Sequence, residues 1–147
     1  MKPQVFQFKD KFRLEQGESL PELNLAFHSY GTLNERADKV IWICHGLTAS
    51  SEVSDCWPGM IGKGKLFDPD IHYIVCANMP GSCYGSTGPS STNPENGLPW
   101  YREFPELTIR DQVHAFDLLR QHLGIRRIHT VIGGSIGASQ ALEYSIT

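Results

Sequence analysis

Hydrophobic and polar positions alternate along two early segments of the chain. Residues 4–15 (QVFQFKDKFRLE) and residues 22–30 (ELNLAFHSY) each place an apolar side chain at about every second position. This period is typical of strands with one face in the core and the other in solvent. The segment between them, QGES at residues 16–19, has the composition of a turn. The pattern predicts an antiparallel hairpin that joins a larger sheet.

Two later segments are apolar at almost every position. Residues 40–44 (VIWIC) and 71–76 (IHYIVC) are typical of strands buried on both faces, as in a parallel sheet covered by helices. The connection between them mixes Gly, Pro, Trp and polar residues, and we expect one short helix within it. Residues 78–100 form a long loop rich in Gly, Pro, Ser and Asn. Loops of this length in compact domains are often functional.

A helix with clear boundaries is predicted after this loop. Thr108 can cap its start, Asp111 supports that cap, and Gly124 marks its end. Residues 128–132 then predict a strand, and a Gly-Gly turn leads to a last helix from Ile136 to about Tyr144. Strands that alternate with helices favour right-handed crossovers. We therefore predict an α/β fold with a mostly parallel sheet and helices on both faces.

The strongest chemical signal is Gly133-Gly134-Ser135-Ile136-Gly137, which matches the pattern G-x-S-x-G. A β-branched strand ends just before it and a helix begins just after it, which is the setting of a nucleophile elbow. Glycine two residues before and two residues after the serine lets the sharp turn lie against its neighbours without a steric clash. The alternative is a plain turn whose serine only caps the helix.

A second signal follows the strand VIWIC. His45-Gly46-Leu47 comes directly after it, and such a turn supplies one backbone donor of an oxyanion hole in folds with this elbow. The other donor is the N–H of the residue after the nucleophile. The expected pair is therefore the backbone N–H groups of Leu47 and Ile136, which would stabilise a tetrahedral oxyanion. The imidazole of His45 has no predicted role in the chemistry.

The elbow and the turn together predict an α/β-hydrolase fold, in which an acid and then a histidine follow the serine in the chain. Residues 136–147 contain Glu143 but no histidine and no aspartate. We therefore expect residues 1–147 to be one partial domain, truncated after the elbow helix, without the lid or the C-terminal part of the triad. Its nucleophile strand would be an open, apolar edge. One hypothesis is that the chain is a fragment without catalytic activity of its own.

Composition limits the partners. The formal net charge is −3 and 20% of residues are charged, so there is no reason to expect nucleic acid or an anionic membrane as a partner. No apolar run approaches the roughly 20 residues needed to span a bilayer, and no signal-peptide pattern is present, so a cytoplasmic location is expected. Cys44, Cys56, Cys76 and Cys83 lack zinc-site spacing, and we predict no metal site and no bound cofactor.

Five ordered blocks of the sequence resemble the homoserine O-acetyltransferases. They are LPELNLAFHSYGTLN, VIWICHGLTASS, NMPGSCYGSTGPSSTNP, FPELTIRDQVHAFDLL and VIGGSIGASQALEY, and the resemblance runs from about residue 12 to the end. Their combination is specific, because other hydrolases of this fold share only the elbow and the HG turn. The resemblance implies transfer of an acetyl group from acetyl-CoA to the side-chain hydroxyl of L-homoserine, a step in methionine biosynthesis.

The resemblance also implies roles for individual residues. Ser135 corresponds to the nucleophile of a ping-pong mechanism with an acyl-enzyme intermediate, and Leu47 and Ile136 correspond to the oxyanion donors. The loop 81–90 corresponds to the segment that lines the acyl and acceptor pocket. Its candidate substrate-binding residues are Gly81, Ser82, Cys83 and Gly85. A homodimer is implied by the resemblance alone.

Departures from the family pattern leave alternatives open. The family usually has Met-Gly-Gly after the serine, where this chain has Ile136-Gly137-Ala138, and it usually has HALTG where this chain has HGLTA. Serine O-acyltransferases and homoserine O-succinyltransferases share much of the pattern. An esterase or other hydrolase of the same fold would need the same Ser135 and oxyanion hole, with water as the acceptor.

Overall fold

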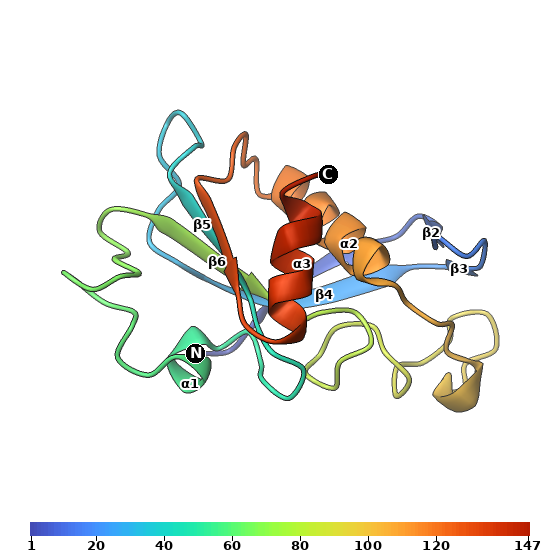
Figure 1. Cartoon of the computed structure of the whole chain (residues 1–147). Helices are drawn as coiled ribbons and strands as arrows, with labels where there is room; N and C mark the ends of the chain where they lie inside the picture. The colour runs from blue at the N-terminus through green and yellow to red at the C-terminus, as the bar shows by residue number, and fades with distance from the viewer.

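The computed structural model describes residues 1–147 and contains a five-stranded sheet, a separate two-stranded sheet and three α-helices (Figure 1). The elements are, in chain order, β1 (Gln4–Phe8), β2 (Phe12–Arg13), β3 (Ser19–Leu20), β4 (Leu23–Tyr30), β5 (Val40–Cys44), α1 (Val53–Cys56), β6 (Tyr73–Ala77), a 3-10 turn (Tyr101–Glu103), α2 (Ile109–His122), β7 (Thr130–Gly133) and α3 (Ile136–Tyr144).

The main sheet has the strand order β1-β4-β6-β5-β7. β5 pairs in parallel with both β6 and β7, whereas β4 pairs antiparallel with β1 and β6. Only β4 therefore runs against the other four strands, and the predicted mostly parallel sheet is confirmed. Since β5, β6 and β7 point the same way, the loops that follow them emerge at one end of the sheet. Figure 1 shows these loops together at the bottom of the view.

The N-terminal hairpin differs in detail from the expectation. The alternating run 4–15 is two strands rather than one, because three charged residues, Lys9, Asp10 and Lys11, interrupt it. β1 pairs along β4 in the main sheet, while β2 and β3 form the small separate sheet. The turn at residues 16–19 lies where predicted, with the Leu14 N–H donating to the Glu18 carbonyl at 2.9 Å.

The strand predicted over residues 71–76 is also shifted. β6 begins at Tyr73, and Ile71 is exposed. Asp68 explains the shift, because its carbonyl accepts hydrogen bonds from the N–H groups of Ile71 and His72, and its carboxylate accepts one from the Asp70 N–H. These bonds hold residues 68–72 in a turn. Similarly, β7 begins at Thr130, two residues later than predicted, and includes Gly133.

Each face of the sheet has its own apolar core. The larger core lies under α2 and α3, and Trp42 of β5 is at its centre, against Phe116 of α2 and Tyr144 of α3. Figure 1 shows α2 and α3 side by side over this face. The smaller core, on the other face, joins Ile41 and Ile43 of β5 to Val53 of the short helix α1. Helices therefore cover both faces, and the short helix expected between residues 44 and 71 is present.

Helix α2 begins with a complete capping box. The Thr108 hydroxyl accepts a hydrogen bond from the Asp111 N–H, and the Asp111 carboxylate accepts one from the Thr108 N–H at 2.9 Å. The other oxygen of this buried carboxylate accepts the Glu15 N–H at 2.8 Å. One aspartate thus starts the helix and also attaches the N-terminal hairpin to it.

Strand β7 lies at the edge of the sheet and has no neighbour on its outer side. Val131 and Ile132 are only half-buried, whereas every residue of β5 is buried. The open apolar edge that the sequence predicted is therefore present. No helix of the chain combines the length and the hydrophobicity that a membrane crossing requires.

Candidate active site

Ser135 occupies a strained turn between β7 and α3. Its backbone angles are φ 57° and ψ −130°, in a region that residues with a Cβ atom rarely adopt. A Cβ atom on Gly133 would overlap the backbone of Gly137, and a Cβ atom on Gly137 would overlap the carbonyl oxygens of Cys44 and His45. Only glycine fits at these two positions, so the turn has the backbone geometry of a nucleophile elbow.

The turn after β5 lies directly against this elbow. A Cβ atom on Gly46 would be 3.9 Å from the Cβ of Ser135, which places the two loops in contact. The N–H of Leu47 has no acceptor within the chain. The N–H of Ile136 belongs to the first residue of α3, where no acceptor exists within the helix. One predicted oxyanion donor, Ile136, therefore follows Ser135 directly, and the other, Leu47, follows Gly46 in the turn that contacts Ser135. Their role stays a prediction.

The surroundings of Ser135 favour a developing negative charge. Its exposed side chain lies at the N-terminus of α3, where the helix dipole is positive. The Ser135 hydroxyl forms no hydrogen bond, and none of the six histidines of the chain bonds to it. His45, in the turn after β5 that lies against the elbow, is buried, and its Nδ1 lies 2.8 Å from the Gly46 carbonyl. Burial lowers the pKa of His45, so this imidazole is neutral and structural.

A cavity of about 260 Å³ opens beside the Leu47 turn. It is lined by Leu47, Gly81, Ser82 and Gln112, together with Met79, Leu107, Phe104 and three prolines. The structure therefore places Leu47, Gly81 and Ser82 around one cavity, and their roles in substrate binding and oxyanion stabilisation stay predictions. Cys83 and Gly85 do not line this cavity. Cys83 is exposed, and a Cβ atom on Gly85 would lie 3.1 Å from the Cβ of Ala26 in β4.

Asn78 joins the two loops of the site, and the sequence reasoning missed it. This buried side chain accepts the Ser51 N–H at 2.6 Å and donates to the Tyr84 carbonyl at 2.8 Å. The Tyr84 hydroxyl in turn donates to the Thr48 carbonyl at 3.1 Å. The loop after β5 and the loop after β6 are thereby fixed to each other. The one available signal was a polar side chain directly after an apolar strand, at the carboxyl end of a parallel sheet.

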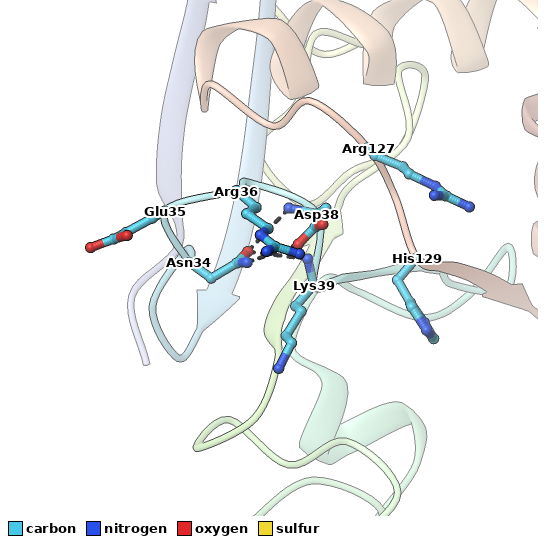
Figure 2. Close-up of a pocket in the computed structure, with 7 residues that line it drawn as sticks. All are labelled: Asn34, Glu35, Arg36, Asp38, Lys39, Arg127 and His129. Carbon is cyan, nitrogen blue, oxygen red and sulfur yellow. Dashed lines mark hydrogen bonds between the residues drawn. The ribbon is translucent and has the colours of Figure 1, made fainter.

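A larger, wholly polar hollow of about 610 Å³ lies at the other end of the strands (Figure 2). Lys39 and His129, which line it, immediately precede β5 and β7, whereas Ser135 follows the far end of β7. Asn34 organises one wall, since its amide bonds to the Asp38 carboxylate and accepts the N–H groups of Asp38 and Lys39. Ligands of parallel sheets bind at the carboxyl ends of strands, so this hollow is not the candidate active site.

Three of the four cysteines, Cys44, Cys56 and Cys76, do not offer a competing nucleophile. Cys44 and Cys76 are buried free thiols, and burial raises the pKa of Cys44 to about 12 and that of Cys76 well above its usual value. Burial also raises the pKa of Cys56. Such thiols are inert, because the thiolate is the reactive form. No group of three or more His, Cys, Asp or Glu side chains is placed to hold a metal ion.

Comparisons with known proteins agree with this geometry. The α/β-hydrolase fold family matches residues 39–147. The homoserine O-acetyltransferase of Cyclobacterium marinum is 48% identical over 147 residues, which are 100% of this chain and 42% of that protein. The crystal structure of homoserine O-acetyltransferase from Bacillus anthracis superposes with a TM-score of 0.90 at 28% identity, covering 99% of this chain and 43% of that one.

A solved esterase is similar to the same extent. Esterase E22 has a TM-score of 0.86 and 32% identity, covering 96% of this chain and 42% of its own. The chain thus spans about two-fifths of the length of the relatives that it matches. The resemblance to homoserine O-acetyltransferases drawn from the sequence blocks is confirmed by the named relatives. Together with the elbow, the HG turn and the sheet order, these matches show that the chain belongs to the α/β-hydrolase family.

Proposed function

We propose that this chain carries the nucleophile and oxyanion hole of an acyltransferase that moves an acetyl group from acetyl-CoA to the hydroxyl of L-homoserine. The observation that supports this proposal most strongly is the pairing of the strained Ser135 turn with the loop containing Leu47. The blocks shared with homoserine O-acetyltransferases favour this substrate pair over other acyl transfers. The product would be O-acetylhomoserine, an intermediate of methionine biosynthesis.

The proposed reaction has two half-reactions. The Ser135 hydroxyl loses its proton to a base and forms a bond to the thioester carbonyl carbon, and the C–S bond then breaks to release the CoA thiol. In the second half-reaction the homoserine hydroxyl gives its proton to the base and its oxygen bonds to the acyl carbon. The bond between the Ser135 Oγ and that carbon then breaks, and Ser135 takes the proton back from the base. In both, the oxyanion would accept hydrogen bonds from the Leu47 and Ile136 N–H groups. Each such donor is typically worth a few kcal/mol in the transition state, about 3 kcal/mol.

The proposed mechanism needs a base, and no residue of this chain bonds to Ser135 as one. We therefore expect negligible transferase activity from the 147-residue polypeptide by itself. Activity should appear when the chain is co-expressed with the part of the Cyclobacterium marinum relative that it does not match. Robust turnover by the isolated chain would contradict this expectation.

The decisive experiment detects the acyl-enzyme. The co-expressed complex is mixed with acetyl-CoA without homoserine, quenched, and examined by intact mass spectrometry. We expect an acetyl adduct on this chain that disappears in the Ser135→Ala variant. The matched control is Ser139→Ala, an exposed serine on the same helix that should leave the adduct unchanged. An undiminished adduct in Ser135→Ala would exclude Ser135 as the nucleophile.

A second candidate function is ester hydrolysis, which the similarity to esterase E22 favours. The same nucleophile and oxyanion hole would serve, with water in place of the homoserine hydroxyl. Adding homoserine to the acetylated complex separates the two. A transferase releases O-acetylhomoserine and its adduct decays faster with homoserine, whereas an esterase releases acetate at a rate that homoserine does not change. Serine in place of homoserine, and succinyl-CoA in place of acetyl-CoA, test the related transferases. The cytoplasmic location and the homodimer stay predictions.

A further inference from the structure

Two glutamine side chains form a buried amide pair between α2 and α3. Gln112 and Gln140 are 8% and 0% exposed, and the Gln140 Nε2 donates to the Gln112 Oε1 at 2.6 Å. Gln140 also lies 3.6 Å from the Met79 sulfur. Gln140 lies in α3, the helix that begins just after Ser135, so the pair connects α2 to the helix that follows the nucleophile. The bond uses the acceptor of Gln112 and leaves the Gln112 Nε2 without any partner in the chain.

Hydrogen-bonding groups without partners therefore surround the cavity beside Leu47. Gln112 and Ser82 both line it. The Ser82 Oγ is buried and has no hydrogen-bond partner, and the Oε1 of Gln140, behind Gln112, also lacks one. A buried polar group left unpaired costs about 1–3 kcal/mol, so such groups in a native site call for a partner. A ligand in the cavity can provide that partner.

The remaining lining favours a neutral ligand group. None of the ten residues around the cavity is charged, and the others are Leu, Met, Phe, Pro and Gly. A carboxylate or ammonium group would find no counter-ion here, whereas a neutral polar group needs none. The lining therefore favours a neutral part of a substrate over its charged ends. At about 260 Å³ the cavity is also smaller than typical whole-ligand pockets, so it takes only a part of a substrate.

We propose that this cavity binds a secondary amide on the neutral arm of the thioester donor. The amide carbonyl would accept a hydrogen bond from the Gln112 Nε2, and the amide N–H would donate to the Ser82 Oγ. Apolar contact with Met79 and Leu107 would hold the methylene groups beside the amide. Leu47 lines this cavity and follows Gly46, which contacts Ser135, so an arm bound here would reach the turn that lies against the nucleophile. The inference rests on the proposed thioester donor, and it makes Gln112 a specificity-determining residue.

The test measures binding by the complete 147-residue chain and does not depend on catalysis. The probe is S-methyl pantetheine, whose blocked sulfur cannot react with the exposed Cys83. Its comparison ligand has each amide N–H replaced by an ester oxygen. Dissociation constants are obtained from ¹⁵N-labelled protein by chemical-shift titration, which also reports whether each variant is folded. We expect the largest shifts at the side-chain amide of Gln112 and at Ser82.

Gln112→Leu should weaken binding of the amide probe about five- to tenfold, as expected for one lost hydrogen bond, and should also weaken binding of the ester analogue, which keeps the carbonyl acceptor. Ser82→Ala is the second variant, because its hydroxyl has no partner whose loss would unfold the chain. Gln121→Leu, on the exposed side of α2, is the matched control and should bind normally.

Equal binding by wild type and both variants, preference for the ester analogue, or no binding by the folded chain would each overturn the inference. Failure of the transferase proposal looks different. In that case the amide probe binds in a Gln112-dependent way while the co-expressed complex forms no acetyl adduct on Ser135.

Discussion

Replacing Ser135 with glycine should stabilise the chain relative to replacing it with alanine. Alanine keeps a Cβ atom at φ 57°, and backbone strain of this kind costs about 1–3 kcal/mol. Glycine relieves this strain but is more flexible in the unfolded chain, which costs about 0.5–1 kcal/mol. The difference predicts that S135G is more stable than S135A by about 1 kcal/mol.

Ser139 provides the reference, because it is exposed and lies within α3 with regular helical neighbours. There glycine should be less stable than alanine by about 1 kcal/mol, the ordinary helix propensity difference. The two sites should therefore differ in sign, with a total contrast of about 2 kcal/mol. The assay is equilibrium urea unfolding followed by tryptophan fluorescence, since Trp42 is buried in the main core. If S135G is less stable than S135A by as much as S139G is less stable than S139A, the turn stores no strain and the reasoning is wrong.

Two further predictions concern the elbow and an acid-sensitive cluster. Gly137→Ala should destabilise the chain by at least about 2 kcal/mol, because the new Cβ would overlap the Cys44 and His45 carbonyl oxygens. Gly46→Ala should cost little, because its new Cβ has 3.8 Å of clearance. Urea unfolding midpoints of the two variants test this, and equal losses of stability would contradict the clash. The Tyr30 hydroxyl, with smaller help from other donors, lowers the pKa of Glu52 from 4.5 to about 2. The contribution of this lowered pKa to the free energy of unfolding is present above pH 4.5 and is lost as pH falls toward 2. Tyr30→Phe should make that loss smaller in urea titrations across this range, and an unchanged pH dependence would refute the role of the hydroxyl.

Local patterns predicted the parts of the fold that local physics determines. The capping box at Thr108 and the close approach of Gly133 to Gly137 depend on residues close in sequence, and each was confirmed. The strand boundaries were less accurate. The periodicity of residues 4–15 and 71–76 did not reveal the charged interruption at 9–11 or the turn that Asp68 holds.

The inner structure of the site could not be predicted in the same way. Asn78 joins two loops through atoms far apart in sequence, and the pairing of Gln112 with Gln140 depends on how α2 packs against α3. In a sequence these residues are ordinary polar positions in a loop and in two helices. Their roles follow only from the tertiary packing, which brings distant side chains within bonding distance and removes them from water.

The order of strands in the main sheet has a consequence for how the chain folds as it is synthesised. β7 is made after all the other strands, yet it pairs with β5, which is complete when the HG turn has just been made. Until β7 arrives, the hydrogen-bonding edge of β5 is unpaired and available to other chains. The loop that contains Leu47 therefore exists before the serine that it would serve. Contact between the two loops therefore waits for the synthesis of β7, and the edge of β5 needs protection from other chains in that interval.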